Sequence, residues 1–290
     1  MKIHFLKGTW KDIIILENKK SIAFIDTGYK EDFIQITKYL KRIGKKDISF
    51  ILLTHFHRDH YGCIPFLVEN YNVDKVYFKE YSGLDKTTAI GTIADDEYRK
   101  NERKKCEEIK SIIRKHSNLI EVEKINCIDF GEVELKLFNN GNSMKEIYED
   151  KNCSEYYHKY SFNENQNSLS VFMKVNGVNV YFGGDTYDNE RLHLLANYNN
   201  KRVALLINEE IDIYKVPHHG TNYCNSEETL EIFKPKIAII TNGKEYLSST
   251  SNVEVDLMKA NSSVKILLTE KHNIVIDINK NSNIKYYELD

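Results

Sequence analysis

The sequence predicts an α/β fold in which two groups of strands form a helix–sheet–sheet–helix sandwich. Short apolar runs rich in β-branched and aromatic residues recur along the chain, and helical patterns lie between several of them. Such an alternation is typical of layered folds in which helices cover sheets. We therefore expect a four-layer αββα arrangement whose functional residues lie where strand ends converge.

The expected elements follow one another along almost the whole chain. Residues 1–6 lead directly into a first strand, and further strands are expected at 12–16, 21–25, 48–53, 73–78, 133–138, 168–175, 178–182, 203–207, 211–216, 237–241, 264–269 and 274–278. Helices are expected at 33–43, 64–70, 92–115, 189–197, 226–233 and 253–261. The mixed charges of 95–105 are interpreted as a solvated face of the 92–115 helix.

A dense group of potential metal ligands follows the strand expected at 48–53. His55, His57, Asp59 and His60 provide three imidazoles and a carboxylate within six residues, a set that suits zinc or a similar divalent metal. The string should arise by chance in roughly one such chain in a thousand. In an extended loop His55 and His57 project to the same side and can reach one metal, whereas Asp59 and His60 point elsewhere, which favours a second metal.

Further donors stand at the ends of two other expected strands. The 178–182 strand is followed by two glycines and Asp185, which could bridge two metals or, alternatively, cap the next helix. The 211–216 strand is followed by His218 and His219, which in isolation could be ordinary surface residues. The recurrence of strand-to-loop donors favours a shared site.

These motifs resemble those of the metallo-β-lactamase fold superfamily. The resemblance rests on the segments 26–28, 54–62, 183–185 and 217–220, in that order, and extends from about residue 2 to about residue 278. Within the superfamily, the chain looks most like the hydrolase domains of bacterial phosphorylcholine esterases and DNA-uptake competence proteins. The segment 165–169, followed by 171–185, is similar to the Asn-Ser-Leu and hairpin segment of both.

The resemblance implies a binuclear centre with defined ligands. One metal would be held by His55 and His57, and the other by Asp59, His60 and His219, with Asp185 between them. His219 is favoured as the ligand and His218 as a contact to substrate phosphate, although the sequence leaves the order of this pair open. The resemblance also makes Asn167 a candidate for substrate binding.

One departure from the superfamily pattern concerns the first metal. Many members have a further metal-binding histidine before the bridging aspartate. Here the corresponding stretch, 165–168, offers only Asn165, Gln166, Asn167 and Ser168. We therefore expect the first metal to be held more weakly, with water or substrate completing its coordination.

Composition sets limits on organisation and location. The chain has 290 residues, only 3 prolines and no Pro/Gly/Ser-rich linker, so we expect a single domain over 1–290. The 5 cysteines lack Cys-x-x-Cys spacing and are interpreted as reduced, mostly buried thiols. With no apolar span of membrane length and no signal-peptide pattern, a soluble cytoplasmic protein is expected, unless a signal peptide has been removed.

Net charge separates the candidate substrates. A formal charge of −2 gives no global attraction to DNA or RNA, whose binding depends on clustered Lys and Arg. A small phosphodiester is therefore favoured, and nucleic acid remains an alternative that requires a local basic groove. The tyrosine-containing polar stretch 139–167 (Tyr148, Tyr156, Tyr157 and Tyr160) is interpreted as packing against the sheet or as a cover that stacks on a base or quaternary ammonium.

The predicted activity is metal-dependent hydrolysis of a phosphodiester. Two divalent ions about 3.5–4 Å apart would lower the pKa of a shared water so that a bridging hydroxide attacks phosphorus. Asp59 is a candidate base and His218 a candidate hydrogen-bond donor to the phosphoryl oxygens. Zinc is expected, with manganese or iron as alternatives. A nuclease and a non-catalytic, metal-stabilised binding module are the competing hypotheses.

Overall fold

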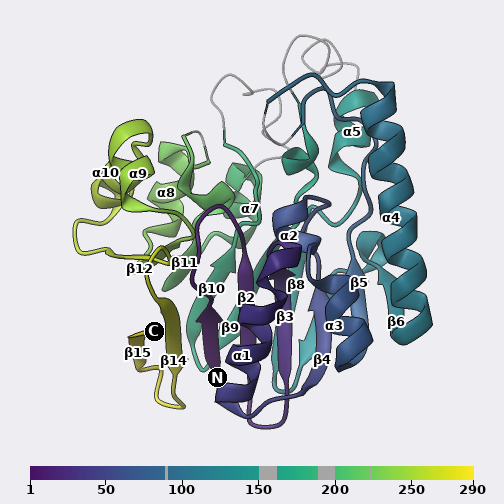
Figure 1. Ribbon diagram of the computed structural model, residues 1–290. Coiled ribbons are helices and arrows are strands. Elements are labelled where there is room, and N and C mark those ends of the chain that lie inside the picture. Colours follow the sequence, from purple (N-terminus) through teal and green to yellow (C-terminus); the bar gives the residue numbers. More distant parts are fainter. Residues whose placement is uncertain (89–90, 150–161, 189–199, 223) are drawn as a thin grey trace.

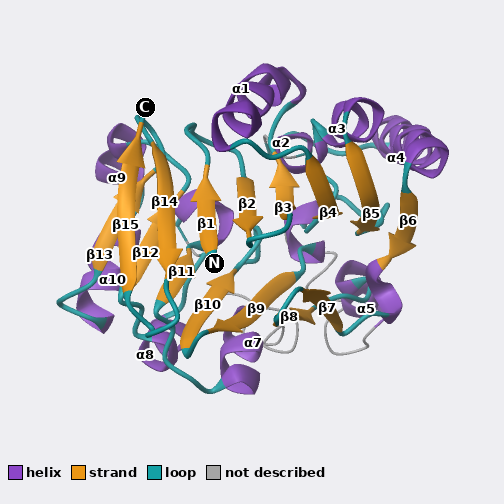
Figure 2. Cartoon of the chain, turned by 90° about the horizontal axis from the view of Figure 1, so that it is seen from below, coloured by secondary structure: helices purple, strands orange, loops and turns teal. Residues whose placement is uncertain are grey.

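The computed structural model shows two mixed β-sheets packed face to face, with helices on both outer faces (Figures 1 and 2). It describes residues 1–88, 91–149, 162–188, 200–222 and 224–290. The first sheet has the strand order β15-β14-β1-β2-β3-β4-β5-β6, and the second has the order β13-β12-β11-β10-β9-β8-β7. The predicted αββα sandwich is confirmed.

The first sheet contains strands from both ends of the chain. Its strands are β1 (Lys2–Phe5), β2 (Ile13–Glu17), β3 (Ile22–Thr27), β4 (Asp47–Leu52), β5 (Asn72–Phe78), β6 (Asn118–Glu121), β14 (Asn273–Ile278) and β15 (Ile284–Leu289). The β3, β4, β5 and β6 strands are parallel neighbours. Helices α1 (Phe33–Ile43), α2 (Arg58–Tyr61), α3 (Ile64–Asn70) and α4 (Asp96–His116) lie on its outer side (Figure 2).

The second sheet is built from the middle and the last third of the chain. Its strands are β7 (Cys127–Phe130), β8 (Val133–Phe138), β9 (Ser170–Val175), β10 (Val178–Phe182), β11 (Ile213–Lys215), β12 (Ile237–Ile240) and β13 (Lys265–Leu268). The β10, β11, β12 and β13 strands are parallel neighbours. The remaining described α-helices are α5 (Ser143–Glu149), α7 (Asn200–Ile207), α8 (Glu227–Phe233), α9 (Lys244–Thr250) and α10 (Val253–Ala260).

Three apolar clusters hold these layers together. The central cluster fills the space between the sheets and includes Phe5, Phe50 and Phe182. A second cluster packs α1, α3 and α4 onto the first sheet, and Cys106, Ile109 and Ile113 of α4 are part of it. A third cluster packs α7, α8 and α10 onto the second sheet. Burial of apolar surface on both faces of each sheet explains the nearly continuous apolar strands.

One predicted strand is a helix, and some predicted features lie outside the described residues. Residues 203–207 were expected to be extended but form the last part of α7, with Val203 and Ala204 buried and Leu205 and Leu206 exposed. A short apolar run does not by itself distinguish a buried strand from one face of a helix. The helix predicted for 189–197, Tyr156, Tyr157, Tyr160 and Cys153 lie outside the described part of the chain, whereas Tyr148 is exposed.

Three cysteines, Cys63, Cys106 and Cys224, are buried and free, and Cys127 is free but exposed. No helix among the described residues is both long and apolar enough to cross a membrane.

Candidate metal centre

The predicted ligands follow the carboxyl ends of parallel strands in both sheets. The histidine cluster follows β4, Asp185 follows β10, and the pair of His218 and His219 follows β11. The carboxyl ends of parallel strands face the same edge of a sheet, where ligands bind in open α/β folds. Packing of the two sheets brings these edges together, so donors that are far apart in the sequence meet at one place.

Four donor atoms from these loops form a compact group. His60 Nε2 lies 3.4 Å from Asp59 Oδ2 and 3.3 Å from Asp185 Oδ2. His219 Nε2 lies 3.3 Å from Asp59 Oδ2 and 3.4 Å from Asp185 Oδ2. All four atoms lie within 4.8 Å of one another. We call Asp59, His60, Asp185 and His219 the four-donor group.

The dimensions and chemistry of this group fit a divalent metal. A tetrahedron with edges of 3.3–3.4 Å has its centre about 2.0–2.1 Å from each corner, the distance at which zinc binds imidazole nitrogen and carboxylate oxygen. Four of the six edges have this length. His60 Nε2 and His219 Nε2 are also buried without a hydrogen-bond partner among the described residues. Buried polar atoms without a partner are costly, so their convergence indicates a bound cation.

The charges in the group are strongly coupled. Burial alone would lower the pKa of His60, but the carboxylates of Asp185, Asp26 and Asp59 outweigh burial and raise that pKa well above its usual value. Burial likewise opposes protonation of His219, yet nearby carboxylates raise its pKa well above the usual value. Burial tends to raise the pKa of Asp59, but His60 and His219 hold it well below the usual value. The carboxylates therefore favour the protonated forms of His60 and His219 in the metal-free chain, and a metal must displace those protons.

A second pair of histidines lies beside the four-donor group. His55 Nε2 lies 3.0 Å from His57 Nδ1 and 3.8 Å from Asp185 Oδ2. Burial, as the largest cause, lowers the pKa of both histidines, so both are neutral and able to bind a metal. His57 Nε2 and Asp185 Oδ1 are buried and lack hydrogen-bond partners among the described residues. Asp185 thus stands between two sets of donors.

His55, His60 and His219 are each oriented through the nitrogen that does not face the other donors. Thr54 Oγ1 and Ser168 Oγ both lie 3.1 Å from His55 Nδ1. Asp26 Oδ2 lies 2.7 Å from His60 Nδ1, and the Thr54 backbone N–H and hydroxyl donate to Asp26. Such partners fix the ring orientation and raise the basicity of a ligating histidine.

The partners of His219 Nδ1 come from two distant parts of the chain. His219 Nδ1 lies 2.9 Å from Thr241 Oγ1 and 3.3 Å from Asp12 Oδ1. Thr241 Oγ1 donates to the same Asp12 oxygen, and the ammonium group of Lys215 pairs with Asp12 Oδ2. Asp12 and Lys215 are each 1% exposed. Asp12, Asp26 and His60 also form a group of potential donors, but their contacts place both carboxylates behind the histidines, as supports of the four-donor group.

The turn that carries His218 and His219 has an unusual backbone. Both residues have positive φ, 44° for His218 and 53° for His219, a region that non-glycine residues rarely adopt. Hydrogen bonds from His218 N–H to the Gly184 carbonyl and from Thr221 N–H to the His218 carbonyl hold the turn. Strained backbone that surrounding contacts impose is common at functional sites. Here it directs His219 into the four-donor group.

His218 stays at the edge of the centre. Its Nε2 lies 4.0 Å from Asp185 Oδ2, 3.0 Å from Asn165 Nδ2 and 3.4 Å from the Tyr187 hydroxyl. Its Nδ1 lies 2.6 Å from Thr221 Oγ1. Burial lowers the pKa of His218 to about 4, so the ring is neutral at pH 7.

The two asparagines of the 164–167 segment have different surroundings. Asn167 donates to the Glu80 carbonyl and to Glu164 Oε1, so its amide nitrogen is directed away from the donors described above. Asn165, two residues earlier, contacts His218 instead. No hydrogen bond among the described residues joins Asn167 to the other predicted site residues.

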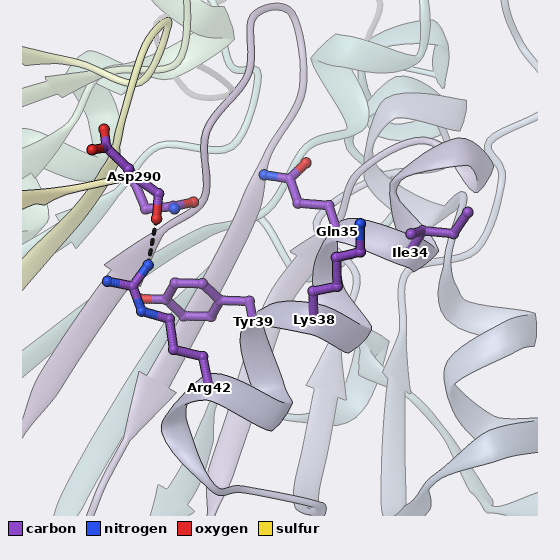
Figure 3. Close-up of a pocket in the computed structure, with 7 residues that line it drawn as sticks. Ile34, Gln35, Lys38, Tyr39, Arg42 and Asp290 are labelled. Carbon is purple, nitrogen blue, oxygen red and sulfur yellow. Dashed lines mark hydrogen bonds between the residues drawn. The ribbon is translucent and has the colours of Figure 1, made fainter.

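A small pocket opens directly beside His57. It has a volume of about 250 Å³ and is lined by His57, Arg58, Tyr61, Thr88, Thr92, Tyr98, Glu102 and Lys105. Another hollow, of about 380 Å³, lies between α1 and the C-terminal residue, where Arg42 donates to the Asp290 backbone carbonyl (Figure 3). The hollow beside α1 is lined by no residue of the candidate metal centre, whereas the pocket beside His57 includes His57 of that centre.

Comparisons with known proteins agree with this fold. Residues 12–137 match the family model of the metallo-beta-lactamase superfamily. The crystal structure of the metallo-beta-lactamase fold protein YhfI from Bacillus subtilis is similar over 99% of both chains, at 9% identity and a TM-score of 0.55. The match therefore relates residues 12–137 to the metallo-beta-lactamase superfamily. At this identity the structural likeness shows the fold alone.

Other solved structures with this fold are more distant. Igni18, a metallo hydrolase from Ignicoccus hospitalis, covers 100% of both chains at 12% identity and a TM-score of 0.48. A metallo-β-lactamase from Cronobacter sakazakii with a HARLDQ motif covers 73% of both chains at 14% identity and a TM-score of 0.43. No curated protein matches the sequence. The described residues of this chain contribute candidate His and Asp ligands for a metal ion.

Sequence reasoning did not identify the residues that orient the ligands. Asp12, Thr241 and Lys215 carry no local motif and come from three separate elements. Their only sequence signal is a polar residue next to a strand end, which is common in any α/β chain. Asp26 was part of the resemblance but had no assigned role.

Proposed function

We propose that this protein is a metal-dependent phosphodiesterase with a binuclear centre. The observation that carries the proposal is the arrangement of the four-donor group, with His55 and His57 beside it and Asp185 between the two sets. A structural zinc site ends at four protein ligands. Two neighbouring sets that share a carboxylate are instead the arrangement used by hydrolases with two metals.

Within this proposal, His55 and His57 hold one ion, and Asp59, His60 and His219 hold the other, with Asp185 shared. When bound, two divalent ions supply a Lewis acid and lower the pKa of water near neutral pH. Zinc suits the imidazole-rich set, and manganese or iron are the alternatives. All other steps fall to the side chains of this protein.

Asp59 is the proposed proton acceptor. Its Oδ2 contacts both His60 and His219, and the side chain is 14% exposed, so the carboxylate can also be reached by water. Its lowered pKa keeps it ionised, so it can accept a hydrogen bond from an attacking water molecule. His218 Nε2 faces the Asn165 amide and the Tyr187 hydroxyl, so we assign His218 to positioning these groups rather than to direct donation to phosphate.

We propose that the pocket beside His57 binds the part of the substrate that does not contact the metal ions. Arg58 and Lys105 line it, while Lys105 also pairs with Glu102 at 2.6 Å. Two cations against one carboxylate favour a substrate that carries negative charge, and about 250 Å³ suits a small organic group. This supports a small phosphodiester over a polymer. A small substrate does not require an extended groove.

Turnover by metal-reconstituted protein tests the proposal. Protein stripped with a chelator and reloaded with zinc or manganese should cleave bis-p-nitrophenyl phosphate only when two ions are bound per chain. His55→Ala, Asp59→Ala and Asp185→Ala should each lower kcat/KM by at least about 10²-fold while the chain remains folded. Activity that persists in all three folded variants would contradict the assignment. Cleavage of p-nitrophenyl phosphorylcholine, measured in parallel, reports whether choline is recognised, and DNA cleavage would favour the nuclease hypothesis.

A further inference from the structure

We infer that the side-chain amide oxygen of Asn165 is the third protein ligand, beside the shared Asp185, for the metal held by His55 and His57. This inference rests on the proposed binuclear centre. It assigns a role to a residue at the place where the sequence departs from the usual superfamily pattern, since no histidine is present in the 165–168 segment.

The first argument is the position of an unpartnered oxygen. Asn165 is 2% exposed, and its Oδ1 is buried without a hydrogen-bond partner among the described residues. The Asn165 side chain approaches the His57 ring, and it also contacts His218, whose Nε2 lies 4.0 Å from Asp185 Oδ2. His57 Nε2 is itself buried and without a partner within the described chain. Two acceptors that each lack a donor, in neighbouring side chains, are satisfied together by a cation.

The second argument is the fixed orientation of the amide. Asn165 Nδ2 lies 3.0 Å from the Tyr187 hydroxyl oxygen and 3.0 Å from His218 Nε2. His218 Nδ1 lies 2.6 Å from Thr221 Oγ1, and donation from this nitrogen leaves Nε2 to accept from the amide. Both contacts are made by the nitrogen end of the amide, which places Oδ1 on the other side of the group. The oxygen is then left for a ligand, and this explains why His218 and Tyr187 lie at the edge of the centre.

The third argument is the rigidity of the segment that carries Asn165. Residues 164–167 form a short 3₁₀ helix that begins at Asn163, whose side chain accepts from the Asn165 backbone N–H. The same segment continues into Ser168, whose hydroxyl contacts His55 Nδ1 and accepts from the Asp185 backbone N–H. One segment thus holds Asn165, His55 and Asp185 in a common frame. Ligands that are held by such neighbours bind metal with little reorganisation.

An amide oxygen in place of an imidazole changes the metal preference of this position. Carbonyl and carboxylate oxygens suit harder ions such as manganese, whereas imidazole suits zinc and iron. The His55 and His57 position would have two nitrogens and at least two oxygens, from Asn165 and Asp185. We therefore expect it to bind zinc more weakly than the four-donor group and to discriminate less against manganese.

Metal binding by Asn165 variants tests the assignment without relying on turnover. Stepwise dissociation constants are measured by competition with a chromophoric chelator, and bound metal is quantified by atomic emission on protein that remains folded by circular dichroism. Asn165→Leu removes the oxygen at similar volume and should weaken one of the two metal steps by at least about tenfold, because loss of even an orienting partner costs about 10- to 100-fold. Asn165→Asp keeps the oxygen and should retain both ions.

Asn165→His gives the sharpest second readout. An imidazole at this position should tighten the weaker zinc step and increase the ratio of zinc to manganese affinity. Asn167→Leu is the matched control, because the same change in the same segment removes an amide directed at Glu80 and Glu164, and it should leave both metal affinities unchanged.

The outcomes separate this assignment from the proposed function. If wild-type protein binds two ions and Asn165→Leu binds both with unchanged affinity, the role of Asn165 is wrong while the binuclear centre stands. If wild-type protein binds fewer than two ions, both proposals fail.

Discussion

At the scale of single residues, a buried ion pair supports the metal centre from behind. Burial alone would raise the pKa of Asp12, but Lys215 and His219 outweigh it and keep the carboxylate ionised. Lys215 remains charged because Asp12 and Asp185 offset its burial, and its pKa is raised. The pair therefore has two separable effects: Asp12 orients His219, and Lys215 neutralises Asp12.

Substitution of this pair should separate stability from metal affinity. Lys215→Met leaves an unpaired buried carboxylate and should lower the free energy of unfolding by about 3–5 kcal/mol. Asp12→Asn/Lys215→Met removes both charges and should recover most of that loss in urea denaturation of metal-free protein. Metal affinity should still fall by about 10- to 100-fold in the double variant, because His219 has lost its carboxylate. Equal metal affinity in the double variant and the wild type would show that Asp12 does not act through His219.

The sequence pattern did not determine which of the two side chains, Asn165 or Asn167, reaches the candidate metal centre. The resemblance singled out Asn167 as a substrate contact, whereas Asn165 is the residue that lies beside His218. In a strand, residues two apart share one side, but a 3₁₀ helix has three residues per turn, so they point in different directions. The local conformation of 164–167 therefore decides which amide reaches the centre, and the sequence did not reveal that conformation.

At the scale of elements, strong periodicity made most of the fold predictable. The helix predicted at 33–43 and the strands predicted at 133–138 and 178–182 have the observed bounds. The β6, β7 and β15 strands were missed, and β6 and β15 are edge strands with many exposed residues and little apolar alternation. The α7 error has the same origin, since its apolar run carries no clear period.

The α2 helix is positioned by a close backbone approach at its C-terminal end. A Cβ atom at Gly62 would lie 2.4 Å from the Lys30 nitrogen and 2.5 Å from the Gly28 carbonyl oxygen, and the Gly62 N–H donates to that same carbonyl at 2.8 Å. The clash is with backbone, which cannot move away as a flexible side chain would. α2 carries Asp59 and His60, so a displacement of this contact would reach the four-donor group.

Gly62→Ala should therefore reduce both stability and metal binding. We expect a loss of about 1–3 kcal/mol in unfolding free energy, as for other overpacked sites. We also expect a lower affinity for one of the two metal ions. Gly44→Ala is the control: Gly44 has φ of 67° at the end of α1, and its added Cβ meets nothing within 4 Å. That variant should lose about 1 kcal/mol through backbone strain and keep its metal affinity. Chemical denaturation and metal competition on both variants measure these two effects. Unchanged metal affinity in Gly62→Ala would show that the backbone contact at Gly62 does not influence the four-donor group.

At the scale of the whole molecule, the metal centre connects the two sheets. Asp59 and His60 follow β4 of the first sheet, whereas Asp185 and His219 follow β10 and β11 of the second. The sequence could predict the donors because each follows a recognisable strand. It could not predict the orienting contacts of Asp12, Thr241 and Lys215, because these depend on how the sheets pack. An ion bound only by the folded chain stabilises it according to its affinity, by about 2.7 kcal/mol at a concentration of 100 times Kd.

This stabilisation should depend on pH in a defined direction. In the metal-free chain, the pKa values of His60 and His219 are raised well above their usual value. A group with a raised pKa in the folded state adds stability that is fully present below its unfolded pKa, about 6.5, and is lost as pH rises through the folded value. Metal-free protein should therefore become less stable as pH increases above neutrality. Metal binding should become tighter over the same range, because fewer protons have to be displaced.

The difference in Tm between zinc-loaded and metal-free protein should consequently widen from pH 6 to pH 9. Calorimetric titrations of zinc in two buffers of different ionisation enthalpy should show that protons are released on binding, with the number released falling as pH rises. Asp26→Asn removes a carboxylate that raises the His60 pKa, so the release should diminish and the onset of tight binding should shift to lower pH. A Tm difference independent of pH, or binding without proton release at pH 7, would mean that His60 and His219 do not exchange protons for metal and would remove the electrostatic basis of the four-donor group.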